Sequence, residues 1–183
     1  MLITAGQSKS HKLSAAMANR AKPQPDLSYI GSLDDLEKVY QVMWNAEIHQ
    51  LKHPEGHPEH EIGREAWDLA FAQMCELTAK KFNPEDEADR DCLVALAAYE
   101  WVLTKKHGKK TYARRIRNSI AEHGIKLAIS KAVLKGASSS GLKTLVEQGK
   151  VGFAFENVIL KYRALFEEID GRLIDKSEKA LRP

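Results

Sequence analysis

The chain has 183 residues, 43% hydrophobic and 29% charged, which is typical of soluble globular proteins. This length suits one hydrophobic core and leaves little room for two. No run approaches the roughly 18 consecutive apolar residues of a membrane span, and the N-terminus lacks the apolar segment of a secretory signal. The sequence therefore argues against a membrane protein or membrane partner and predicts a cytoplasmic protein.

Residues 1–31 differ from the rest of the chain. Serine and basic residues interleave there without sustained periodicity, and Pro23 and Pro25 interrupt the segment near its end. Segments of this composition do not bury enough apolar surface to fold alone. We therefore expect a flexible, basic N-terminal arm over residues 1–31, followed by a single helical domain over residues 32–183.

Three segments in the first half of the chain carry apolar residues at helical spacing. They predict helices over residues 33–52, 60–82 and 84–106. Ser32, with Asp35 three residues later, forms a capping pattern for the first helix. Asn83 followed by Pro84 suits the start of the third helix, because asparagine caps well and proline is tolerated at the first helical position.

The only two cysteines, Cys75 and Cys92, lie in apolar stretches of the second and third predicted helices. Neither belongs to a CxxC motif or to a larger cysteine framework. We therefore expect reduced thiols in the core and no disulfide.

The second half of the chain predicts shorter helices. Thr111 and Gly124 suit the two ends of a helix over residues 111–123, and another helix fits residues 125–135. GASSSG, residues 136–141, predicts a loop, and two or three short helices follow it. Because alternating strand patterns are almost absent, the expected fold class is an all-α bundle of about six to eight helices.

Charge is distributed unevenly along the chain. The overall net charge is +3. By segment, the net charge is +3 for residues 1–31, −10 for 32–104, +9 for 105–135 and +1 for 136–183. Such asymmetry bears on the partners of a protein and not on its fold. We call residues 105–135 the basic segment.

The predicted helix 111–123 of the basic segment is amphipathic. A turn of about 100° per residue places Tyr112, Ile116 and Ile120 on one buried face and the cations with Asn118 on the other. Lysine, arginine and asparagine are side chains that contact phosphates and base edges. We therefore predict nucleic-acid binding, mainly through phosphates and with little base specificity, by Lys105, Lys106, Lys109, Lys110, Arg114, Arg115, Arg117 and Asn118.

The basic segment allows two other interpretations, in which its cations either only face solvent or dock on an acidic protein surface. That surface belongs either to a partner or to the acidic helices of this chain. The helix over residues 125–135 adds a reason to consider assembly, because Ile129 and Leu127 lie on nearly opposite sides and both are apolar. Such a helix is either enclosed in the core or in contact with another chain, so the formation of a homo-oligomer is an alternative.

Four of the seven histidines lie close together in HQLKHPEGHPEHEIGRE, residues 49–65. His49, His53, His57 and His60 supply nitrogen donors that suit zinc. However, no cysteine lies near in sequence, and HExxH is not formed, because Arg64 stands where its second histidine would be. We interpret the stretch as a polar turn with adventitious affinity for metal, and a zinc site as the alternative.

An enzyme is the third interpretation. Projection of the predicted helices places Glu47, Glu100 and His123 near buried faces, where burial would raise a carboxyl pKa toward the working range of an acid or base. Neither glutamate begins the Glu-x-x-His repeat of di-iron bundles. Whether the three side chains converge is not encoded in the order of residues, so the sequence favours binding over catalysis.

Overall fold

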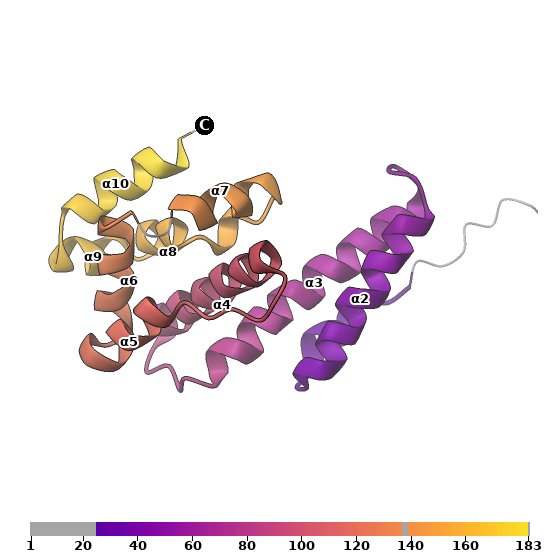
Figure 1. Ribbon diagram of the computed structural model, residues 1–183, viewed down its shortest axis with the longest axis horizontal. Helices are drawn as coiled ribbons and strands as arrows, with labels where there is room; N and C mark the ends of the chain where they lie inside the picture. Colours follow the sequence, from indigo (N-terminus) through magenta and orange to yellow (C-terminus); the bar gives the residue numbers. More distant parts are fainter. Residues whose placement is uncertain (1–24, 137–138, 183) are drawn as a thin grey trace, which may run out of the picture.

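A computed structural model describes residues 25–136 and 139–182, and it is helical throughout (Figure 1). Over these residues it has nine α-helices, two short 3₁₀ helices and no strand. The α-helices are α2 (Leu36–Lys52), α3 (Pro58–Lys80), α4 (Glu87–His107), α5 (Arg114–His123), α6 (Ile125–Leu134), α7 (Ser139–Glu147), α8 (Phe155–Lys161), α9 (Arg163–Ile169) and α10 (Arg172–Leu181), and the 3₁₀ helices are η1 (Ser28–Ser32) and η2 (Val151–Phe153). The all-α prediction is confirmed, although the predicted number of helices is slightly low.

The predicted arm falls mostly outside the described residues, which begin at Pro25. Its last residues form η1, whose Ile30 is completely buried and which packs against α3. The packed part of the chain therefore begins before the predicted boundary at residue 32. In the described ranges no helix combines the length and apolar character needed to cross a bilayer.

Helices α2 and α3 form an antiparallel pair that extends away from the C-terminal helices (Figure 1). Gly63 allows the two helices to approach closely, since a Cβ there would lie 3.0 Å from Cγ of Gln50 and 3.1 Å from the carbonyl oxygen of Ala46. The N-cap of α2 is Asp35, whose carboxylate accepts the N–H of Glu37 at 2.8 Å. The predicted capping role of Ser32 is therefore wrong, since Ser32 ends η1.

Helix α4 begins later than the sequence predicts. Asp86 is its N-cap and accepts the N–H of Asp89 at 2.8 Å. Asn83 instead adopts a left-handed conformation with φ of 50° in the preceding turn, which asparagine tolerates better than most residues. The predicted N-cap at Asn83 is therefore wrong, because this residue completes the turn after α3.

Two hydrophobic clusters share α4. One joins α4 to α5, α6, α8, α9 and α10 around Ile129 and Phe166, and the other joins it to η1, α2, α3 and α7 around Phe71. Cys75 and Cys92 are free, buried thiols within these clusters. Burial raises the pKa of both thiols, that of Cys92 to about 12. The predicted core thiols are thus confirmed for the described residues.

The C-terminal half differs most from the sequence expectation. Helix α7 begins at Ser139, inside the stretch predicted to be a loop. Gly141 is needed in that helix because a Cβ at this position would overlap the ring of Tyr99 on α4. Four helices follow the predicted loop instead of two or three, since the segment after Gly149 is divided at Tyr162 and Asp170. Ile129 of α6 is enclosed, while Leu127 is 39% exposed.

Candidate nucleic-acid interface

The basic segment turns back on itself between α4 and α5. Gly108 ends α4 in a left-handed conformation with φ of 65°, as glycine commonly does after a helix. The chain then runs antiparallel to the end of α4, where Oγ1 of Thr104 accepts the N–H of Thr111 at 3.0 Å. Helix α5 begins only at Arg114 with Ala113 as its N-cap, so the predicted cap at Thr111 is wrong.

A buried ion pair joins α4 to α5. Glu100 is only 6% exposed, and its carboxylate accepts two N–H groups of Arg117 at 2.6 Å each. It also accepts the backbone N–H of Ala113 at 3.0 Å. The Arg117 guanidinium lies over the rings of Phe82 and Tyr112, 4.9 Å and 4.4 Å from their centroids. These contacts hold the start of α5 against α4.

This pair corrects the predicted position of Arg117. The helical projection placed Arg117 in solvent with the other cations, but its side chain is 30% exposed and bonded to Glu100. The hydrogen bond to Glu100 raises the pKa of Arg117, so the guanidinium stays charged. Because its charge is already compensated inside the protein, Arg117 is a structural cation.

The predicted burial of other residues on this helix is correct for some positions and wrong for others. Ile116 is buried and Ile120 half-buried, as predicted, but Tyr112 precedes the helix and is 45% exposed. His123 is exposed beside Glu122, so its predicted burial is wrong. Glu47 is also exposed, with its carboxylate 4.0 Å from Nζ of Lys105. Glu47 and Glu100 both line the cleft described below but His123 does not, so the three groups of the enzyme hypothesis do not converge.

Few cations of the basic segment pair with carboxylates. Among its ten, only Lys105, Arg117 and Lys126 form an ion pair with a described residue. Lys110 lies over the ring of Tyr112, 5.5 Å from its centroid. We use the name basic cluster for the exposed cations at the end of α4 and the start of α5, which are Lys106, Lys109, Lys110, Arg114 and Arg115.

Helix electrostatics distinguish two groups within this cluster. Lys106 occupies the last turn of α4, where the helix dipole favours positive charge. Arg114 and Arg115 occupy the first turn of α5, which has no acidic residue and where the dipole favours negative charge. Helix stability therefore explains the position of Lys106 but not the positions of Arg114 and Arg115.

Carboxylates at the acidic start of α4, unlike the cations of the basic cluster, form ion pairs within the chain. Nζ of Lys126 lies 2.7 Å from the carboxylate of Asp86 and 2.9 Å from that of Asp89, which is 5% exposed. Lys161 lies 2.6 Å from Asp91. Part of the basic segment thus docks on acidic helices of its own chain, as one interpretation anticipated, but that part is Lys105, Arg117 and Lys126 and not the basic cluster.

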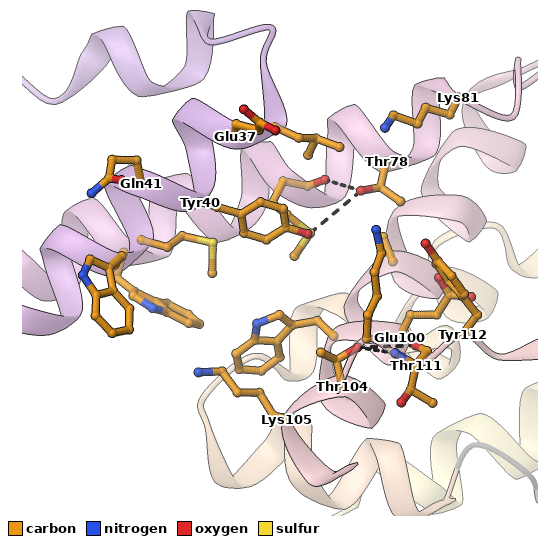
Figure 2. A pocket seen from close by; sticks show the side chains of 18 of the residues that line it. Glu37, Tyr40, Gln41, Thr78, Lys81, Glu100, Thr104, Lys105, Thr111 and Tyr112 are labelled. Atoms are coloured by element: carbon orange, nitrogen blue, oxygen red, sulfur yellow. Dashed lines mark hydrogen bonds between the residues drawn. The ribbon is translucent and has the colours of Figure 1, made fainter. Parts of the chain in front are cut away.

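An open cleft of about 1060 Å³ lies beside the basic cluster (Figure 2). Helix α3 forms its floor, α2 and α4 form its walls, and the segment after α4 closes one end. Its lining comprises Leu36, Glu37, Tyr40, Gln41, Met43, Trp44, Glu47, Trp67, Met74, Thr78, Lys81, Phe82, Ala97, Glu100, Trp101, Thr104, Lys105, Lys110, Thr111, Tyr112 and Arg117.

Aromatic side chains dominate this cleft. All three tryptophans of the chain line it, and Trp44 is 61% exposed. Tyr40 is 49% exposed, although its helical spacing resembles that of the core residues Val39 and Met43. Sequence reasoning missed the cleft because an aromatic beside the core stripe of a helix has the same spacing whether it is covered or open. Contiguous exposed apolar patches are common at contact surfaces.

The four clustered histidines make local structural contacts. Nδ1 of His57 accepts the N–H of Glu59 and caps α3, and Nδ1 of His60 lies 3.1 Å from the carbonyl oxygen of His53. Nδ1 of His49 lies 3.1 Å from the carbonyl oxygen of Glu59. No three histidine, cysteine or acidic side chains within residues 25–136 and 139–182 are grouped so as to hold a metal ion.

Comparison with known proteins gives no further information, because no family model, curated protein or solved structure matches this chain. Inference about function therefore depends on the charge, exposure and geometry of the side chains described above.

Proposed function

We propose that this protein binds nucleic acid and that the basic cluster contacts the phosphates. The observation that carries the proposal is the pair Arg114 and Arg115. Both are exposed, neither pairs with a carboxylate within the described chain, and both oppose the dipole of the helix that they begin. The two arginines lower the stability of the helix that they begin, and binding of an anionic ligand would explain their presence there.

The chemistry of these side chains favours phosphate as that ligand. Arginine presents a planar fork of donors that binds phosphate through two hydrogen bonds. Lys106 and Lys109 supply further charge from the adjoining turn, and exposed Asn118 follows on the same helix. Lys105 and Arg117 belong to the same basic segment but already contact Glu47 and Glu100. Such contacts fix position on a strand and carry little sequence information.

The predicted organisation fits this proposal. The basic residues of the N-terminal segment would add to the attraction for phosphates, and the described residues would form one domain acting in the cytoplasm. An acidic partner protein is the second candidate, since Lys126 already shows that lysines of this segment bind carboxylates.

The test is fluorescence anisotropy of labelled single-stranded DNA, duplex DNA and RNA over a salt series. Arg114→Ala/Arg115→Ala should weaken binding and reduce the magnitude of the log-log salt slope by about 1.4 to 1.8, because each lost contact removes about 0.7 on single strands and 0.9 on duplex DNA. Lys38→Ala/Lys52→Ala is the matched control, since it removes two exposed charges from α2. No binding at low salt and micromolar protein would exclude the proposal and favour the acidic partner.

A further inference from the structure

The cleft exists because α2 and α4 both pack on α3 but are separated from each other (Figure 1). Tyr40 of α2 lies on one side of the opening, and Thr104 and Lys105 of α4 lie on the other (Figure 2). A volume of about 1060 Å³ lies just above the range of about 300–1000 Å³ for small-molecule sites. The opening therefore has room for more than one flat ring.

The buried ion pair holds one aromatic side of the cleft in place. Tyr112 lies against the Arg117 guanidinium, which is fixed by its two hydrogen bonds to Glu100. On the opposite wall, Trp44 projects from α2 with 61% of its surface exposed. The exposed ring of Trp44 has the character of a stacking platform for bases, whatever the sequence.

The distribution of charge around the cleft predicts how a bound strand would be oriented. Lys110 belongs both to the cleft lining and to the basic cluster, so the two surfaces are continuous. Glu37, whose carboxylate forms no ion pair with a described residue, lies on the α2 wall and would repel phosphates there. A strand would therefore keep its backbone along the start of α5 and direct its bases toward α2.

The geometry points to the cleft as a stacking site for unpaired bases of single-stranded nucleic acid whose phosphates lie on the basic cluster. This inference depends on the proposed function and specifies its ligand class. In a duplex the bases are already paired and stacked, so only unpaired bases can enter such a site. A preference for single strands over duplexes follows.

The experiment compares a short oligothymidylate with an abasic strand of the same length and with a duplex, using the full chain. Oligothymidylate should bind more tightly than either competitor. It should also quench tryptophan fluorescence, because every tryptophan of the chain lines the cleft. The abasic strand should bind through the basic cluster without that quenching.

Trp44→Ala should weaken binding of oligothymidylate about tenfold to a hundredfold and leave binding of the abasic strand unchanged. Leu51→Ala is the matched control, because Leu51 is an apolar residue of α2 that is 82% exposed and lies outside the cleft. It should change neither affinity.

Equal binding of the oligothymidylate and the abasic strand, without quenching, would overturn the stacking site and leave phosphate binding intact. Failure of every strand to bind would overturn both proposals together. Tighter binding of the duplex would contradict the preference for unpaired bases. Self-association that buries the tryptophans and is lost in Trp44→Ala would assign the cleft to a second copy of the chain.

Discussion

The two ends of α4 carry opposite charges and use them differently. At the start of the helix, Asp86 and Asp89 are neutralised by Lys126 and Asp91 by Lys161, so the charges join distant parts of the chain. At the other end, the cations of the basic cluster form no ion pair in the described part of the chain. Charge at the first end contributes to the fold, and charge at the second is available to a ligand.

Arg117 shows that proximity in sequence does not decide between these uses. It lies only two residues after Arg115, yet it contacts Glu100, while Arg114 and Arg115 face solvent. A net charge of +9 for the basic segment therefore overstates what a ligand would meet. We predict that removing paired charges lowers stability, and that removing unpaired charges weakens binding without lowering stability.

The largest effect on stability should come from Glu100→Ala. Removing this buried carboxylate leaves Arg117 without its counter-charge and frees the N–H of Ala113. Loss of one partner of such a pair should lower the free energy of unfolding by about 3 kcal/mol, measured by urea denaturation. Glu47→Ala, which removes an exposed carboxylate, should stay within about 0.5 kcal/mol. Equal effects of the two substitutions would show that the pair does not stabilise the fold.

A smaller loss should follow Lys126→Ala. Asp89, with 5% exposure, would keep its carboxylate but lose the ammonium 2.9 Å away. We expect a decrease of about 2 kcal/mol in the free energy of unfolding, since a buried polar group is left without its partner. Lys106→Ala is the control from the other end of α4 and should change stability little. If both lysines behaved alike, the distinction between the two ends of α4 would be wrong.

A gain in stability is expected from Arg114→Glu/Arg115→Glu. Acidic side chains at the start of α5 would complement the helix dipole that the arginines oppose, adding about 0.3–1 kcal/mol per position at low salt. The same variant should lose nucleic-acid binding. A simultaneous fall in both quantities, measured by urea denaturation and anisotropy, would mean that the arginines serve the fold.

The smallest effect concerns acid sensitivity. The hydrogen bond from Lys126 lowers the pKa of Asp86, and the N–H of Asp89 adds to this. A carboxyl whose pKa is lowered by folding stabilises the protein above its unfolded pKa of about 3.9, and this stabilisation is lost as pH falls through the folded pKa. In Lys126→Ala the loss of stability between about pH 4 and pH 2 should be shallower than in the parent protein. Urea midpoints over this range test it, and parallel curves would contradict it.

The long helices could be predicted from the sequence because the spacing of apolar residues is a local property. The periods around Val39, Met74 and Leu96 predicted α2, α3 and α4 with small errors at their ends. Those errors arose where several residues can cap a helix, as at Ser32 and Asn83. The prediction of a loop over residues 136–141 was partly wrong, because small residues also permit close packing of helices, as Gly141 does against Tyr99.

The candidate sites were less predictable because they depend on contacts between distant residues. Glu100 and Arg117 pair across the turn after α4, and the projection of a single helix contains no information about that partner. The exposure of Trp44 likewise depends on the separation of α2 from α4. Composition identified the basic segment correctly, and only the tertiary structure divides its charges between fold and surface.

The most direct test of this division is amide chemical-shift mapping while unlabelled single-stranded DNA is added to the isotope-labelled full chain. We predict that shifts concentrate in residues 105–118 and around Trp44 in the cleft, with none at Asp86, Asp91 or Lys126. Shifts confined to the acidic start of α4, or spread evenly over the chain, would contradict the central claim that the unpaired cations are the binding surface.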